Sequence, residues 1–235
     1  MLRYPRPADQ EIAGLIASSF AIGRVASIIS VLESILVPLG DLASTLATIH
    51  TSALEEIFAG FVYRFYRTEH LIGLLSGIQR LLKRHGTLHD AFRAHDEDST
   101  VSTVTQALDG FVLELYGAAA YPPKMISIPS RGSGCKRLHL FMRWMVRHDS
   151  VDPGTWSGID PSRLLVPVDA HMLNISRRLG VTRRKSGDAK TTAEITDFYR
   201  AIAPDDPVRY DFALTRLGIH PGLDYSELSV LELRE

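Results

Sequence analysis

Residues 130–148 read SRGSGCKRLHLFMRWMVRH, and this stretch carries the clearest structural signal in the chain. It opens with a turn that contains two glycines and continues as a helix predicted from Lys136 to about His148. Apolar side chains recur in that helix at i, i+3, i+4 and i+7, the spacing of a face turned toward a core: Leu138, Phe141, Met142 and Met145. The stretch therefore predicts a helix packed within a larger helical protein.

The helical period continues on both sides of this stretch. Apolar stripes at helical spacing run through residues 12–20, 28–36, 54–65, 71–82 and 101–115, and again through 172–179. Further helices are predicted to begin at the capping pattern Thr191-x-x-Glu194 and at Asp206-Pro207, the latter covering 208–217. No stretch alternates with period two for long enough to predict a strand. The predicted fold class is all-α.

Several single residues predict where these helices begin or end. Asp9 is a candidate N-cap for the first helix, Pro38 is expected to end the second, and Gly86 is expected to close the helix of residues 71–82. Two long irregular stretches, 118–135 and 152–169, interrupt the pattern. Because long loops between well-patterned helices usually carry function, we expect a site near them.

Composition excludes several kinds of site and a membrane-spanning protein. The 235 residues carry a net charge of −1 and a single cysteine, Cys135, which excludes a disulfide, a four-thiolate zinc site and a cysteine-ligated iron–sulfur cluster within one chain. No apolar run reaches the roughly 18 residues that a membrane span needs, and the first residues do not resemble a secretory signal. We therefore expect a cytoplasmic protein.

Charge is unevenly distributed along the chain. Two segments, 131–147 and 177–190, are strongly basic, whereas acids collect at 96–98 and 205–206. Basic segments of this kind either contact nucleic-acid phosphates or form solvated helix faces. The candidate phosphate contacts in these segments are Arg131, Arg137, Arg143, Arg183, Arg184 and Lys185.

The glycine turn is compatible with anion binding. It is not a nucleotide-hydrolase phosphate loop, because its glycines are too close together and no strand precedes it. Nor is it a nucleophile elbow around Ser133, since Arg131 stands where a glycine is required. The remaining functional interpretation is a hairpin between two helices, in which Gly132 and Gly134 free backbone N–H groups to face a phosphate. The alternative is that the glycines only form the turn before the helix and bind no ligand.

Lys136 and Asp169 are the candidate catalytic residues. Lys136 lies at the first turn of its helix, where the helix dipole and burial would both lower the pKa of the amine, as a nucleophile requires. Asp169 is placed to cap the helix that follows Pro167-Val168, which would hold an ionised carboxylate ready to stabilise a cation. The plainer alternatives are a surface lysine and a purely structural cap.

These residues resemble a known family. Gly132-Ser-Gly-Cys-Lys136 and Val168-Asp169-Ala-His-Met are similar to the hairpin lysine and the following aspartate of helix-hairpin-helix DNA glycosylases of the endonuclease III type. Most of the chain, including the segments 132–149, 161–180 and 207–218, is more closely similar to an uncharacterised conserved bacterial family related to those enzymes, in a branch without the iron–sulfur cluster. Ala170 stands where glycosylases of this type usually carry threonine.

The resemblance implies a fold and a mechanism. Two helical lobes are expected around a cleft, with 21–148 forming a barrel-like lobe that ends in the helix-hairpin-helix, and 1–20 with 149–235 forming the other. A bifunctional glycosylase and AP lyase would bind damaged duplex DNA, extrude an oxidised base such as 8-oxoguanine, and attack C1′ with Lys136 while Asp169 assists. Monomeric action at the nucleoid is expected, without a cofactor or metal.

Further residues are candidates for a base pocket or for supporting contacts. The aromatic and histidine side chains that could line a base pocket are Trp144, Trp156, Tyr63, Phe65 and His171. We interpret His85, His89 and His95 as members of a solvated loop rather than of a metal site. Two alternatives to a glycosylase are a non-catalytic helix-hairpin-helix DNA-binding protein and a helical interaction protein with no nucleic-acid role.

Overall fold

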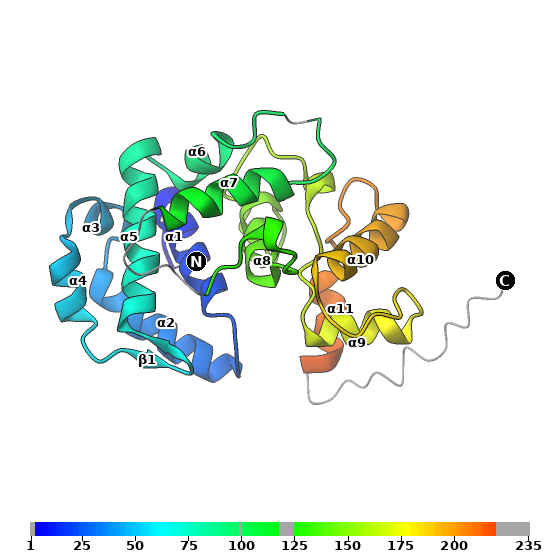
Figure 1. Cartoon of the computed structure of the whole chain (residues 1–235), viewed down its shortest axis with the longest axis horizontal. Coiled ribbons are helices and arrows are strands. Elements are labelled where there is room, and N and C mark those ends of the chain that lie inside the picture. Colours follow the sequence, from blue (N-terminus) through cyan, green and yellow to red (C-terminus); the bar gives the residue numbers. More distant parts are fainter. Residues whose placement is uncertain (1–2, 99, 118–124, 220–235) are drawn as a thin grey trace.

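A computed structural model describes residues 3–98, 100–117 and 125–219, so residues 118–124 of the first predicted loop lie outside the described part. The described chain is mostly helical, which confirms the all-α prediction (Figure 1). Its helices, in order, are α1 (Pro7–Ser19), α2 (Val25–Leu39), α3 (Leu42–Thr48), α4 (Thr51–Ile57), α5 (Thr68–His85), α6 (Leu88–Arg93), α7 (Thr105–Tyr116), α8 (Lys136–Val146), α9 (Ala170–Arg178), α10 (Ala189–Ile202) and α11 (Asp211–Ile219).

Several helix boundaries differ from those predicted. Asp9 lies inside the first turn of α1, where its carboxylate accepts hydrogen bonds from Arg6 and from the backbone N–H of Ala43. Helix α2 includes Pro38 and ends one residue later. The N-cap of helix α10 lies three residues before the predicted capping residue Thr191, because Asp188 accepts a hydrogen bond from the N–H of Thr191. The end of α5 is as predicted, with Gly86 at φ +85°.

The predicted helix over 54–65 is wrong. Helix α4 ends at Ile57, and the chain then forms a small antiparallel hairpin of β1 (Val62–Tyr63) and β2 (Tyr66–Arg67). The apolar residues of this segment divide between two faces, with Tyr63 and Tyr66 buried and Val62 and Phe65 exposed. Because the run is short and rich in aromatics, its spacing fits a helix and a hairpin equally well.

The last helix also starts later than predicted. Residues 204–210 form turns, and α11 starts at Asp211 instead of 208. Asp206 does not cap α11; its carboxylate binds the guanidinium of Arg147 instead. The segment 205–211 thus supplies carboxylates to α8.

The helices pack as two groups around α8. Helix α1 packs against α2, α3, α6 and α8, while α9 packs against α11. Figure 1 shows α9, α10 and α11 on one side of α8 and the other helices on its opposite side. The helix contacts of α1 listed above all lie within residues 21–148. One buried core cluster joins residues from both groups.

Helix α2 is largely exposed despite its apolar sequence. Only Val31, Ile35 and Leu39 are buried, whereas Val25 and Val37 are exposed. Within the described residues, no single helix is long and apolar enough to cross a membrane, and only α2 with α3, bent by 61°, meets the criteria of length and composition as a pair.

Candidate functional site

The glycine turn is present and is followed directly by α8. A 3₁₀ turn, Pro129–Arg131, precedes it, so within the described residues the element directly before the turn is not an α-helix. Gly132 has φ +79°, and Cys135, at the N-cap of α8, has φ +43°. The turn contacts a distant segment, because Ser133 forms a β-bridge with Asp188 and the carbonyl of Gly132 accepts a hydrogen bond of 3.1 Å from Ala189 N. It therefore holds α8 against the start of α10.

Gly134 is required by this contact. A Cβ at position 134 would lie 2.2 Å from the carbonyl oxygen of Gly187, a backbone atom that cannot move independently. Gly134→Ala is therefore expected to lower the free energy of unfolding by about 1–3 kcal/mol. Gly132→Ala is the matched control, because its Cβ meets no atom within 4 Å and only the positive φ opposes it, at roughly 1 kcal/mol. Denaturant unfolding of both variants checks this; a larger loss at Gly132 would contradict it.

Lys136 and Asp169 lie together. Lys136 is the first residue of α8, and its Nζ lies 3.8 Å from Oδ2 of Asp169. Asp169 is the N-cap of α9, as predicted, with Oδ1 accepting a hydrogen bond of 2.8 Å from the N–H of Met172. One carboxylate oxygen is thus fixed by the helix and the other faces the amine. The two side chains are 37% and 20% exposed, so the pair is accessible without being fully solvated.

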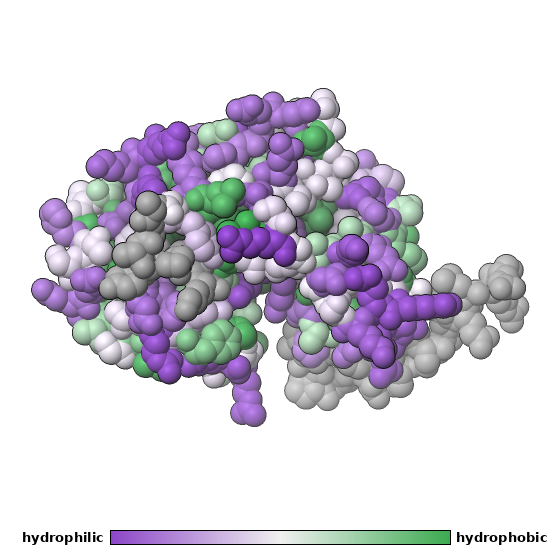
Figure 2. All heavy atoms as spheres, in the orientation of Figure 1, coloured by the Kyte–Doolittle hydropathy of each residue, from purple (hydrophilic) through white to green (hydrophobic). Residues whose placement is uncertain are grey.

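Both residues line one cavity of about 760 Å³ between the two groups of helices. Figure 2 shows the molecular surface hollowed between the larger and the smaller part. The walls come from the α1–α2 connection, α8, α9 and α11, and they include Ile22, Gly23, Arg24, Leu140, Trp144, His171, Phe212 and Thr215. Volume and lining are those of small-molecule pockets, which combine apolar walls with a few polar groups. Trp144 and His171 line this cavity together with Lys136 and Asp169.

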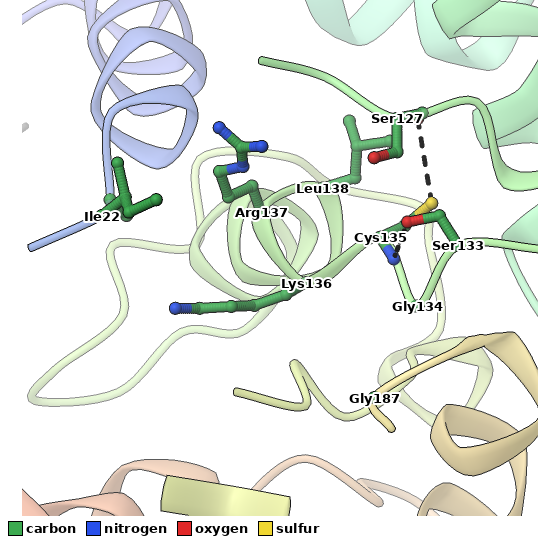
Figure 3. Close-up of a pocket in the computed structure, with 10 residues that line it drawn as sticks. Ile22, Ser127, Ser133, Gly134, Cys135, Lys136, Arg137, Leu138 and Gly187 are labelled. Carbon is green, nitrogen blue, oxygen red and sulfur yellow. Dashed lines mark hydrogen bonds between the residues drawn. The ribbon is translucent and has the colours of Figure 1, made fainter. Parts of the chain in front are cut away.

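A second, smaller cavity adjoins Lys136 on the side of the glycine turn. It has a volume of about 260 Å³ and is lined by Ile22, Ser127, Gly187 and residues 133–138. Figure 3 shows the side chain of Lys136 extending away from Cys135, whose thiol points to the carbonyl of Ser127. Burial raises the pKa of that thiol to about 11, so Cys135 is an inert turn residue.

Arg143 is not a surface contact for phosphate, contrary to the prediction. It is 4% exposed at the base of the large cavity, with its guanidinium 2.9 Å from Asp152 and also paired with Asp211. Arg147, one turn later, binds Asp149, Asp152 and Asp206. The basic face of α8 is thus an internal ion network that joins it to α11 and the neighbouring turns.

This network predicts a pH dependence of stability. Burial raises the pKa of Asp211 from 3.8 to about 6, against the opposing effect of Arg143. Between those values the folded chain holds a proton at Asp211 that the unfolded chain releases, so the carboxyl's contribution to stability is complete below pH 4 and is lost as the pH rises through 6. The free energy of unfolding of the wild type, relative to Asp211→Asn, should fall by about 1–3 kcal/mol over this range in denaturant titrations. A difference independent of pH would contradict this.

The other predicted cations divide into two sets. Arg137 is turned inward, since Nη1 donates hydrogen bonds to the hydroxyl of Tyr66 at 2.6 Å and to the carbonyl of Ser19 at 3.0 Å. Arg184 pairs with Asp188 at 2.7 Å, and the N–H of Thr191 together with Arg184 keeps the pKa of the Asp188 carboxyl far below its usual range. The other three predicted phosphate contacts, Arg131, Arg183 and Lys185, are exposed. They lie on the two turns that the Ser133–Asp188 bridge holds together.

Two of the predicted pocket aromatics are core residues instead. Trp156 is 4% exposed, stacks on His89 and donates a hydrogen bond of 2.7 Å to the buried carboxylate of Glu11. Tyr63 donates to the carbonyl of Ile22 and does not line the cavity of Lys136. Both predictions are therefore wrong.

The histidine prediction also needs correction. His85 is the last residue of α5 rather than part of a loop, and Nε2 of His85 and of His95 each lies 2.8 Å from the carboxylate of Glu114. His89 stacks on Trp156 rather than facing solvent. His85 and His95 thus contact α7 through Glu114, whereas His89 of α6 contacts the irregular segment that follows α8.

Sequence reasoning missed Asp211 and the hairpin. Asp211 is separated from Arg143 by 68 residues, and no spacing rule connects them. The hairpin contacts the cavity wall and α8 through Tyr63 and Tyr66. The feature of the sequence that could have indicated it is the cluster of aromatic residues.

Comparison with known proteins gives a family but no activity. No curated protein and no solved structure matches the chain significantly. A family model with the description "Protein of unknown function (DUF2400)" matches residues 1–220, which includes the glycine turn and the Lys136–Asp169 pair. The chain belongs to the DUF2400 family.

Proposed function

We propose that the protein is a DNA base-excision glycosylase with AP lyase activity, which removes an oxidised base such as 8-oxoguanine from duplex DNA. The observation that carries this proposal is the lysine–carboxylate pair at 3.8 Å on the wall of a cavity of about 760 Å³. An amine beside a fixed carboxylate, facing a space of this size, suits attack on a sugar carbon with a charged transition state.

The chemistry assigns a role to each group. The proton that Nζ must lose before attack has an acceptor in Oδ2 of Asp169. Nζ then forms a bond to C1′ as the bond from C1′ to the base breaks, and the departing base takes up a proton. Asp169 is held in place by the N–H of Met172, so its negative charge stays beside the sugar while positive charge develops there.

The covalent intermediate accounts for the lyase step. Opening of the sugar ring gives a protonated Schiff base between Nζ and C1′. Loss of a proton from C2′ then expels the 3′ phosphate by β-elimination, and water releases the amine. Base excision and strand cleavage would thus use one amine.

Binding to DNA would rely on the exposed cations beside the glycine turn. Arg131, Arg183 and Lys185 lie on two turns in contact through Ser133 and Asp188. Each phosphate contact adds to the salt dependence of binding, so the affinity for duplex DNA should fall steeply as salt is raised.

Two measurements on the wild-type protein test the proposal. The first is the salt dependence of binding to duplex DNA, and the second is borohydride trapping on duplexes with an abasic site or 8-oxoguanine. A covalent adduct with strand cleavage supports the enzyme. Salt-dependent binding with no adduct on either duplex would indicate a non-catalytic DNA-binding protein. Absence of binding would contradict any role in nucleic-acid recognition.

A further inference from the structure

Helix α2 and strand β1 lie side by side and border a groove that is separate from the cavity of Lys136 (Figure 1). This α2 groove has a volume of about 650 Å³. Its walls are formed mainly by small side chains of α2 and by the hairpin: Ala26, Ser27, Ser30 and Ser34 on α2, with Val62 and Arg64 on the hairpin. No residue that lines the α2 groove also lines the cavity of Lys136, so the groove is a surface of its own.

The α2 groove leaves apolar side chains in contact with solvent. Val62 of β1 is 60% exposed, and Val37, three residues after Ser34 on the same face of α2, is 72% exposed. The lining also includes the buried Val31 and the half-buried Phe61. Exposed apolar side chains that gather around a concave surface are typical of a site that binds another molecule.

The unpaired charges beside the α2 groove are positive. Arg64 lines the groove, and its guanidinium lies against Gly23, where a Cβ would be 3.0 Å from Nε. Arg24, the next residue along the chain, is the exposed N-cap of α2. Neither arginine forms an ion pair within the described residues, whereas Glu33, the one acid of α2, already pairs with Arg3 at 3.3 Å. A complementary partner therefore carries carboxylates as well as apolar side chains.

The shape of the surface distinguishes among the classes of partner. A lipid surface suits apolar side chains that protrude, whereas those of the α2 groove border a hollow. Duplex DNA offers phosphates to the arginines but little apolar surface to the valines. An amphipathic helix lays its apolar face into a groove of this kind and keeps its charges along the rim. Helix α2 has 15 residues and a length of about 22 Å, so a partner helix of similar length spans it.

We infer that the α2 groove binds an acidic amphipathic helix of a partner protein. The apolar face of that helix contacts Val37 and Val62, and its carboxylates lie beside Arg24 and Arg64. Apolar contact supplies most of the affinity, while the charges set the orientation and the choice of partner. The inference does not depend on the proposed function, since it concerns a surface outside the cavity of Lys136.

Binding of three peptides to the full chain tests this inference. Each peptide has 15 residues, to match α2. The first carries leucine at helical spacing on one face and glutamate elsewhere, the second has lysine in place of glutamate, and the third has serine in place of leucine. In fluorescence anisotropy, the glutamate peptide should bind at least about tenfold more tightly than either of the others. Equal binding of the glutamate and lysine peptides, or no binding of the glutamate peptide, would overturn the inference.

Variants of the chain locate the binding surface. Arg64→Glu should weaken binding of the glutamate peptide by about tenfold and strengthen that of the lysine peptide, whereas Arg64→Lys should keep the wild-type preference. Val62→Ser should weaken the glutamate peptide by about three- to tenfold, because apolar contact is lost. Leu113→Ser, which changes an apolar side chain on α7 that is 50% exposed, is the matched control and should have no effect. Unchanged binding in both Arg64→Glu and Val62→Ser would place the peptide elsewhere and refute the inference.

Other occupants of the α2 groove give different results. A second copy of the chain would appear in sedimentation as a dimer that Val37→Ser disrupts. A membrane would appear as binding to phosphatidylserine vesicles that Val62→Ser weakens, and duplex DNA as displacement of the glutamate peptide by DNA. The chain's own segment 220–235 would be the occupant if a peptide of that sequence bound more tightly than the glutamate peptide. Any of these results would overturn the assignment to a partner helix.

Discussion

Replacing Lys136 with glutamine is expected to abolish the borohydride adduct and to slow base release in single-turnover reactions by at least about a thousandfold. Glutamine has no amine to attack C1′, so the covalent route is closed. The fold should be retained, because the Lys136 side chain is 37% exposed and its single ion pair contributes little to stability. Trapping on an abasic duplex and the rate of base release give the two readouts.

The control for this variant is Lys185→Gln. Lys185 is an exposed cation on the turn beside the glycine turn, so its loss should weaken DNA binding in a salt-dependent way without removing the adduct. A Lys136→Gln protein that still forms the adduct would show that another amine is the nucleophile. Loss of DNA binding alone would assign Lys136 to phosphate contact.

Arg143→Met is expected to have the largest effect on stability, a loss of about 3–5 kcal/mol. The guanidinium of Arg143 pairs with two buried carboxylates, Asp152 and Asp211. Its removal leaves the negative charge of both carboxylates less well compensated. For a chain of this length, the melting temperature should fall by roughly 10 °C. Thermal and denaturant unfolding measure the change directly.

Two further variants isolate the ion network. Arg184→Met breaks an ion pair in which both side chains are more than a third exposed, and it should cost at most about 1 kcal/mol. Asp211→Asn added to Arg143→Met should recover part of the loss, because it removes one of the carboxylates left without its partner. A stability loss at Arg143 no larger than that at Arg184 would contradict the internal role of the network.

The local features of the candidate site could be predicted from the sequence. The amphipathic stripe beginning at Leu138 placed α8 correctly, and the preference of aspartate for N-caps identified Asp169. Both depend on rules that act over a few residues. The approach of Lys136 to Asp169 came from the family resemblance, since no local rule brings residues 33 positions apart to 3.8 Å.

The errors arise where distant segments decide the outcome. Sequence periodicity puts Arg143 and Arg147 on one face of α8 but does not say what that face meets, and it meets carboxylates from α11 and two turns. The aromatic run at 61–66 has too few residues to distinguish a helix from a hairpin, which is decided by the packing of Tyr63 and Tyr66 on Phe20. Tertiary contacts override local preference in both cases.

Mass spectrometry of the borohydride-reduced complex tests the central claim most directly. The protein would be reacted with a duplex that carries a single abasic site, reduced, digested with nuclease and protease, and sequenced. The account predicts a deoxyribose fragment on Lys136, the amine 3.8 Å from Asp169. A fragment on any other amine, or an unmodified peptide around Lys136 despite DNA binding, would contradict it.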